Sequence, residues 1–253
     1  MVDNTSVISE NLAGKRIAVT GSTGFVGTAL VERLLRSAPD CELVLLVRPS
    51  KRHDPAERVR REIFKNNCFD RLKAQLKDTD EPFDAMVARR VRAIGGDVST
   101  DGLGLDDAGR EVMASVDIVI HSAAAVAFDS PLDSAVEINL MGPVRIAQTL
   151  NDLGVTPHLV AVSTCYVAGN RRGNAPEELV SEGPFDLGLN WRKEVTAARR
   201  LRSDLEAASR DPDHLRALRK EAQTELGAAG APALAAKTEQ LRERWVSDQL
   251  VEA

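Results

Sequence analysis

Three glycines recur at a spacing of three residues in TGSTGFVG, which runs from Thr20 to Gly27. At a turn between a strand and a helix, one glycine makes the tight turn, one lets backbone N–H groups approach a pyrophosphate, and one lets the helix pack against the strand. The segment could instead be an ordinary structural turn. Because it joins an apolar run to a helical pattern, it predicts a dinucleotide-binding loop made of Gly21, Ser22, Thr23, Gly24, Phe25, Val26 and Gly27.

A basic cluster follows the next apolar run, at the place where an NAD-selective site would put an Asp or Glu on the adenosine ribose 2′-hydroxyl. The chain has Arg48 there, with Lys51 and Arg52 close behind it in VRPSKR. A guanidinium suits a 2′-phosphate in both charge and geometry. The cluster therefore favours NADP(H) over NAD(H) as the cofactor. The alternative is a solvated basic loop that binds nothing.

Unbroken apolar runs alternate with longer helical patterns before and after these motifs. The predicted strands are Arg16–Thr20, Glu42–Val47, Val91–Gly96, Val116–Ala123 and His158–Thr164. Unbroken runs are typical of parallel strands that are buried on both faces. The predicted helices are Gly24–Ser37, Pro55 to about Lys77, Asp106–Ala114 and Leu132–Leu153. This order predicts an α/β fold with a doubly wound, Rossmann-like parallel sheet and helices on both of its faces.

The pattern changes after Thr164. Residues 165–190 are predicted to form a loop over the carboxyl edge of the sheet. Residues 191–253 contain no strand-like run and predict a C-terminal all-helical extension, broken near Asp211-Pro212 and at Gly227–Pro232. Leu215, Leu218, Ala222 and Leu226 fall on one helical face, and Leu234, Leu241 and Trp245 fall on another. We therefore expect an NADP-binding Rossmann domain at 1–190 and a helical extension or insertion at 191–253.

Composition argues against several classes of protein. The 253 residues carry a formal net charge of −5, which speaks against nucleic acid as the main partner. Cys41, Cys68 and Cys165 have no C-x-x-C spacing and the histidines have no metal-binding spacing, so no disulfide framework or metal site is predicted. His121 ends an apolar run and is expected to be a hydrogen-bonded core residue. With no signal-peptide pattern and no long apolar stretch, a cytoplasmic protein, at most peripheral to a membrane, is expected.

Four further motifs accompany the glycine loop in a consistent order. They are GDV at Gly96–Val98, HSAA at His121–Ala124, Asn139 in INLMGP, and VSTCYVAG at Val162–Gly169. With these motifs the chain resembles an extended short-chain dehydrogenase/reductase over about residues 14–190. It is most similar to the branch that includes fatty acyl-CoA reductases and the thioester-reductase domains of carboxylic acid reductases.

The resemblance implies a role for each matching residue. Asp97 and Val98 would flank the adenine, and Ala123 and Ala124 would line the cofactor ribose. In the active site, the implied roles are support of a water network for Asn139, a position beside the nicotinamide for Ser163 and a hydrogen bond to the substrate carbonyl for Thr164. From the residues alone, a Ser-Thr pair that ends a strand can equally be a local cap.

The chain departs from the family at the general acid, which is the Tyr of a Tyr-x-x-x-Lys pair. The chain has a single tyrosine, Tyr166, and the residue four positions later is Asn170. We therefore interpret the sequence as the N-terminal part of a longer reductase, which would be inactive by itself because the proton donor is missing.

The resemblance implies an NADPH-dependent reductase of fatty acyl thioesters, whose substrate is an acyl-CoA or an acyl carrier protein thioester and whose product is an aldehyde or alcohol. Two alternatives stay open. One is a non-catalytic dinucleotide-binding sensor or scaffold, which the missing Tyr-Lys pair favours. The other is a different activity of the extended family, such as epimerisation or ketone reduction.

Overall fold

The computed structural model describes residues 4–50, 53–127, 129–167, 172–183, 186–228 and 230–252. Several residues used in the sequence analysis lie outside this range, namely Lys51, Arg52, Gly169, Asn170 and Ala253. The chain divides into two compact units. Unit 1 comprises Met1–Ala124 and Ile138–Ser163, and unit 2 comprises Ala125–Glu137 and Thr164–Ala253. The expected domain boundary between residues 190 and 191 stays a prediction.

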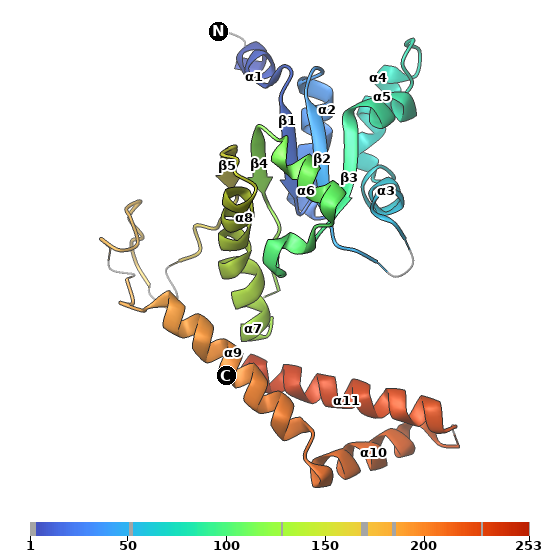
Figure 1. The fold of residues 1–253 in the computed structure, drawn as a ribbon, viewed down its shortest axis with the longest axis vertical. Helices are drawn as coiled ribbons and strands as arrows, with labels where there is room; N and C mark the ends of the chain where they lie inside the picture. Colours follow the sequence, from blue (N-terminus) through green and yellow to red (C-terminus); the bar gives the residue numbers. More distant parts are fainter. Residues whose placement is uncertain are drawn as a thin grey trace. The chain divides into compact units, whose positions relative to one another are not determined.

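Unit 1 is built on a five-stranded sheet in which every neighbouring pair is parallel. Its strands are β1 (Arg16–Thr20), β2 (Glu42–Val47), β3 (Val91–Gly95), β4 (Ile118–His121) and β5 (His158–Ala161). The strand order is β3-β2-β1-β4-β5, so the order reverses between β1 and β4 (Figure 1). In open sheets of this kind ligands bind outside the carboxyl ends of the strands at such a reversal. The doubly wound parallel sheet predicted from the sequence is confirmed.

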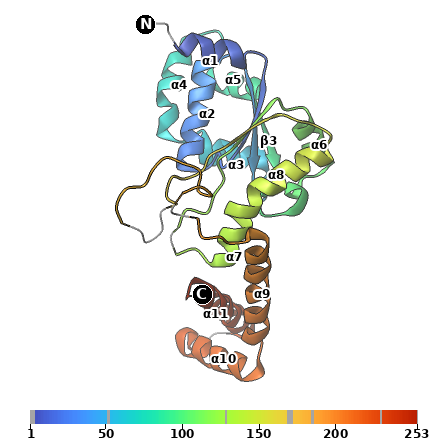
Figure 2. The same cartoon turned by 90° about the vertical axis from the view of Figure 1, so that its left-hand side faces the viewer.

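Helices cover both faces of this sheet (Figure 2). On one face β1 and β2 pack against α2 through a buried cluster that includes Val19, Leu45 and Leu35. On the other face the alternate strand residues pack against α6 and α8, as Val44 does with Met113 and Ile146. The helices of unit 1 are α1 (Asn4–Leu12), α2 (Phe25–Ser37), α3 (Pro55–Arg58), α4 (Asp70–Leu76), α5 (Phe83–Arg90), α6 (Asp107–Ala114) and α8 (Met141–Asp152). Of these, α1 and α5 were not predicted.

The single helix expected from Pro55 to about Lys77 is wrong. After α3 the chain forms a π-helical turn at Val59–Ile63 (η1) and a 3₁₀ turn at Asn67–Phe69 (η2) before α4 begins. The Asn66 side chain accepts a hydrogen bond from the backbone N–H of Cys68 at 3.0 Å, which caps the new turn. The break brings the rings of Phe64 and Phe69 to a centroid distance of 5.2 Å, in an edge-to-face pair. Tertiary aromatic packing therefore outweighs helix propensity here.

The expectation that all strands are buried on both faces is wrong for β5. Every residue of β5 is exposed, including Leu159 and Val160. The strand pairs only with β4 and forms an edge of the described sheet. An apolar run indicates that a strand is suited to burial. Whether the strand is buried depends on the elements that cover it.

Unit 2 contains the helical extension, as predicted. Its helices are α7 (Leu132–Ala135), α9 (Trp191–Ser209), α10 (Pro212–Leu226) and α11 (Ala231–Glu252), with breaks at the expected positions. Leu218, Ala222 and Leu241 form its buried apolar cluster. Leu226 is 37% exposed at the end of α10, beside Gly227, whose φ is +61°. No helix in the described ranges is both long and apolar enough to cross a membrane.

Ion pairs join α7 and the turn after it to α9 within unit 2. Arg199 binds Glu137 through Nε and Nη2, at 2.5 and 3.1 Å. One turn along α9, Arg202 binds Asp133 at 3.1 Å. The matched spacing of these pairs orients α7 against α9.

Candidate functional site

The glycine loop forms the turn between β1 and α2. Glycine is required at two of its positions because other parts of the backbone lie too close for a side chain. Gly21 has φ of +72°, and a Cβ there would lie 2.5 Å from the backbone nitrogen of Ala123. A Cβ on Gly27 would collide with the carbonyl oxygen of Gly21 and lie 2.9 Å from the Cα of Ser22. Any side chain at either position would therefore push β4 or α2 away from the loop.

The start of α2 leaves backbone donors available beside this loop. Gly24 is the N-cap and makes no side-chain cap hydrogen bond. The first N–H groups of a helix have no partner inside the helix, and they favour an anion such as a pyrophosphate. Phe25 is 95% exposed and Val26 is 54% exposed, so the first turn is open on its outer side. The loop as built therefore fits a dinucleotide pyrophosphate.

The remaining polar side chains of the loop differ in exposure. Thr23 is exposed, whereas Ser22 is buried and its hydroxyl has no hydrogen-bond partner among the described residues. The Thr28 hydroxyl donates to the Ser22 carbonyl at 2.9 Å and holds the loop against α2. Thr23 is therefore accessible to a ligand in this conformation, and the Ser22 side chain is not.

The end of β4 is tied to the end of β1 by a buried polar contact. The Thr20 hydroxyl and Nδ1 of His121 are hydrogen-bonded at 2.8 Å, and the hydroxyl also accepts from the N–H of Ala123 at 3.3 Å. His121 is 4% exposed, and burial lowers its pKa below the ordinary value, so the ring is neutral at pH 7. The expectation of a hydrogen-bonded core histidine is confirmed. This contact places Ala123 directly beside Gly21.

Arg48 and Asp97 lie at the carboxyl ends of β2 and β3, on the same edge of the sheet as the glycine loop. Arg48 is exposed and follows β2 directly. The carboxylate of Asp97 accepts from the N–H and the hydroxyl of Ser99, at 2.8 and 2.7 Å, and so shapes its own turn. Val98 is buried in the core, and Ala124 is exposed. The structure therefore brings the predicted cofactor residues of unit 1 to one edge.

Arg58 is a residue at this edge that the sequence analysis missed. Its Nη1 donates to the backbone carbonyl of Arg48, while Nε and Nη2 bind the two carboxylate oxygens of Glu62, each at 2.7 Å. The pair with Glu62 is visible in the sequence as an Arg and a Glu four residues apart within a helical pattern. The contact with Arg48 crosses a loop, and no periodicity indicates it.

The predicted catalytic residues fall on different elements. Asn139 is exposed on a π-helical turn at Val136–Leu140 (η4), which interrupts the helix expected over Leu132–Leu153. Ser163 is exposed two residues after β5 and ends unit 1. Thr164 begins the second segment of unit 2, and its hydroxyl accepts from the N–H of Tyr166 at 3.0 Å, which is a local turn contact. Tyr166 is 78% exposed. The roles of these residues stay predictions.

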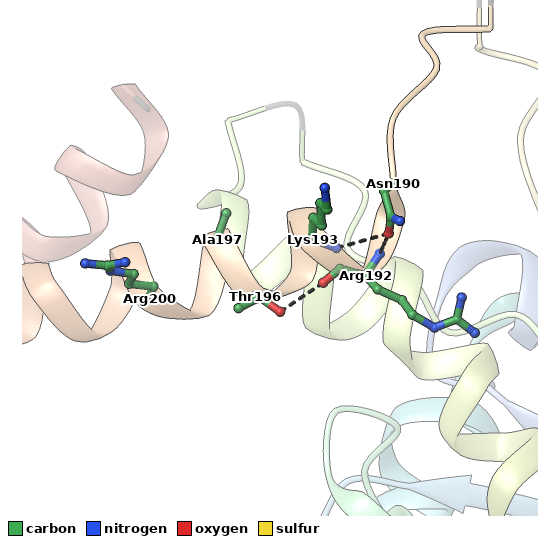
Figure 3. A pocket seen from close by; sticks show the side chains of 6 residues that line it. All are labelled: Asn190, Arg192, Lys193, Thr196, Ala197 and Arg200. Carbon is green, nitrogen blue, oxygen red and sulfur yellow. Dashed lines mark hydrogen bonds between the residues drawn. The ribbon is translucent and has the colours of Figure 1, made fainter.

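A separate hollow of about 510 Å³ lies along the N-terminal part of α9 (Figure 3). Asn190 caps the helix by accepting from the N–H groups of Arg192 and Lys193, at 3.1 and 3.3 Å. The guanidinium of Arg192 stacks 4.3 Å from the ring of Trp191. The lining is cationic and contains no carboxylate: Asn190, Arg192, Lys193, Thr196, Ala197 and Arg200.

The comparisons with known proteins agree with the fold. Residues 19–237 match an NAD-binding family model described as Male sterility protein. Probable fatty acyl-CoA reductase 5 of Arabidopsis thaliana is 34% identical over 197 residues, which cover 74% of this chain and 39% of the relative. Fatty acyl-CoA reductase 1 of Homo sapiens is 35% identical over 184 residues, which cover 71% of this chain and 33% of the relative.

Among solved structures, the terminal R domain from the myxalamid PKS-NRPS biosynthetic pathway matches with a TM-score of 0.51 and 24% identity. The match covers 76% of this chain and 46% of that domain, and it supports the fold.

The fold and the glycine loop define a Rossmann-like protein of the NAD-binding type. Because the family match spans most of the sequence, the chain belongs to the Male sterility protein family. The resemblance to the fatty acyl-CoA reductase branch is thereby confirmed. The chain spans about two fifths or less of the length of these relatives.

Proposed function

We propose that unit 1 binds NADP(H) along the carboxyl edge of its sheet. The observation that carries the proposal is the glycine loop, where Gly21 and Gly27 leave room that a Cβ would fill and α2 presents free N–H groups. The exposed side chain of Arg48, at the end of β2, stands where a 2′-phosphate would lie. A cation at this place, where NAD-selective sites carry a carboxylate, supports NADP(H) over NAD(H).

We propose further that the complete protein reduces a fatty acyl thioester, carried by coenzyme A or an acyl carrier protein, to an aldehyde or alcohol. The support is the identity with fatty acyl-CoA reductases over most of this chain. A bound reduced nicotinamide supplies the hydride for such a reaction. Thr164 would donate a hydrogen bond to the carbonyl oxygen as negative charge develops on it, with Ser163 beside the nicotinamide and Asn139 supporting a water network.

In this proposal the 253 residues lack the Tyr-x-x-x-Lys pair that would supply the proton. The single tyrosine, Tyr166, is followed four positions later by Asn170 and not by a lysine. We therefore expect these 253 residues alone to bind cofactor and to lack reductase activity. A non-catalytic dinucleotide-binding module is the second candidate function, and the same absence of the Tyr-Lys pair favours it.

Titration calorimetry with NADPH and NADH tests the cofactor proposal. The chain is expected to bind NADPH more tightly, and Arg48→Ala to remove most of the difference, because a charge-assisted hydrogen bond contributes about 1.5 to 3 kcal/mol. Arg33→Ala, an exposed substitution on α2, is the matched control and should leave both dissociation constants unchanged. Equal affinity of the unmodified chain for the two cofactors would refute NADP(H) selectivity.

An activity assay separates the two candidate functions. A longer form that carries a Tyr-x-x-x-Lys pair should oxidise NADPH in the presence of a long-chain acyl-CoA, and the 253-residue chain should not. Loss of a positioned acid costs about 10²- to 10⁴-fold in rate. Robust activity of the short chain would point to Tyr166 as the donor, whereas inactivity of the longer form would favour the non-catalytic module.

A further inference from the structure

The guanidinium of Arg58 contacts the backbone at the end of β2. Arg58, at the end of α3, donates through Nη1 to the backbone carbonyl of Arg48. Its other two nitrogens bind both oxygens of Glu62, each at 2.7 Å. Arg58 is also more shielded than its partner, since its side chain is 17% exposed and that of Glu62 is 41% exposed. The guanidinium is therefore held in one orientation, and that orientation faces the main chain of Arg48.

The backbone that carries Arg58 is itself fixed. The Asp54 carboxylate caps α3 by accepting from the N–H of Glu57 at 2.8 Å, and Pro55 occupies the first turn. The N–H of Arg58 donates to the carbonyl of Asp54 at 3.0 Å. Arg58 is therefore part of a capped helical turn that begins at Asp54.

The charge of Arg58 is already matched within this cluster. Its hydrogen bonds to Glu62 raise the pKa of Arg58 above the ordinary value, and the same contact lowers the pKa of Glu62. Both groups stay charged near neutral pH and compensate each other. The Arg58–Glu62 pair therefore adds little net positive charge that could attract a phosphate. By contrast, no ion pair or side-chain hydrogen bond of Arg48 is seen among the described residues, so its charge is not compensated there. The contact with the Arg48 carbonyl is the part of the arrangement that can affect ligand recognition.

We propose that Arg58, oriented by Glu62, is a positioning residue that sets the preference for a cofactor with a 2′-phosphate by holding the main chain from which the Arg48 side chain extends. The inference rests on the proposed NADP(H) function. It assigns a role in cofactor preference to Arg58, which lies outside the motifs on which that function was proposed. If the backbone of Arg48 is already restrained, less conformational entropy is lost when its side chain binds the phosphate. Such prior ordering improves affinity without any new contact.

The test measures dissociation constants of the 253-residue chain for NADPH and NADH in four forms: unmodified, Arg58→Met, Glu62→Gln and Arg61→Met. We expect Arg58→Met to weaken NADPH binding by about three- to tenfold, the effect of ordering one long side chain, and to leave NADH within about twofold. Glu62→Gln should act in the same direction but less strongly. Arg61→Met is the matched control because, among the described residues, the ion pair seen for Arg61 is with Glu57, at 3.4 Å, and it should change neither constant.

The double variant Arg48→Ala/Arg58→Met shows whether Arg58 acts through Arg48. If it does, Arg58→Met has no further effect on NADPH binding once Arg48 is gone. Equal weakening of both cofactors by Arg58→Met would indicate a purely structural role and overturn the inference, as would an unchanged NADPH constant. If Arg48→Ala abolishes the preference while Arg58→Met and Glu62→Gln retain it, the inference fails and the proposed function stands. If the unmodified chain shows no preference, the cofactor proposal itself fails.

Discussion

Arg90 of unit 1 and Arg242 of unit 2 are both buried, and they are satisfied by different partners. In unit 1, Arg90 is 4% exposed and donates to the backbone carbonyls of Leu35, Ala38 and Cys41, at 2.7, 2.5 and 3.0 Å. Two of these carbonyls lie at the end of α2, where helical carbonyls have no partner of their own. Arg90 therefore joins α5 to the end of α2 and the start of β2 without the help of any carboxylate.

In unit 2, the buried arginine is Arg242 of α11, which is 3% exposed. It donates to the carboxylates of Glu206 and Glu239, at 2.6 and 2.7 Å, and to the hydroxyl of Ser209 at 2.8 Å. The apolar cluster of unit 2 is small and centres on Leu218 and Leu241. Packing of α9 against α11 therefore depends on charged side chains, whereas the contact of Arg90 with the end of α2 depends on backbone carbonyls.

The Arg90 and Arg242 contacts should therefore respond differently to a change in pH. Carbonyl partners do not titrate, so the contacts of Arg90 do not vary with pH. Carboxylate partners do titrate, and a buried arginine that loses them is left with an uncompensated charge.

Arg90→Met should have the largest effect on stability. It leaves several buried carbonyls without donors, which we expect to cost about 3 to 5 kcal/mol in the free energy of unfolding of unit 1. Arg89→Met is the control, because the adjacent Arg89 is 59% exposed and pairs with Glu81 on the surface. Denaturant titration followed by hydrogen exchange in β1 and β2 measures the loss. A loss of stability of similar size in the Arg89 variant would show that the buried contacts of Arg90 are not the cause of the loss.

Hydrogen exchange of the unmodified chain should reveal the next largest difference. Amides of β1 and β4, around Val19 and Ile118, should exchange at least about 100-fold more slowly than those of α9, α10 and α11, because a small apolar cluster opens locally more easily than a layered core. Equal protection of residues 195–250 and of these strands would show that the helices are an integral core element and not an extension.

Arg242→Met should destabilise unit 2 by about 1 to 3 kcal/mol, less than a fully buried pair because its carboxylate partners are partly exposed. The effect should be confined to exchange in α9 and α11. Arg244→Met, on the same helix with a side chain that is 77% exposed, serves as the control and should change little. If Arg242→Met also reduced hydrogen-exchange protection in the sheet of unit 1, the two units would not be stabilised independently.

Acidification should produce the smallest and most selective effect. Hydrogen bonds from Arg242 hold the pKa of Glu239 below its ordinary value. Burial alone would raise the pKa of Glu206, but hydrogen bonds from Arg242 and Arg202 outweigh it and the pKa is lowered. Because these carboxylates bind fewer protons in the folded state, their contribution is fully present above the unfolded pKa of about 4.5 and is lost as the pH falls through the folded values. Protection factors, which correct for the slower intrinsic exchange at lower pH, should therefore fall in α9 and α11 before they do in β1 and β2 as the pH is lowered from 6.

The sequence predicted the features that depend on near neighbours in the chain. The bounds of β1 and β2 are as predicted, and the glycine loop lies at the turn between β1 and α2. The breaks on both sides of α10 also agree, because Asp211-Pro212 and Gly227 act within a few residues. The predicted cofactor residues of unit 1 share one edge because the carboxyl ends of parallel strands always do.

The sequence by itself determined which residues could form turns, cap helices or lie on a buried face. Side-chain type sets the local backbone preference, and the spacing of apolar residues shows helical or strand periodicity. Only the tertiary structure decided which of them meet. The collision that keeps Gly21 free of a side chain comes from Ala123, about a hundred residues later, and the partners of Arg90 and Arg58 lie on other elements. The exposure of β5 and the break at Asn66 were likewise decided by what packs beside them. Such contacts depend on proximity through space, which the periodicity of a single segment does not encode.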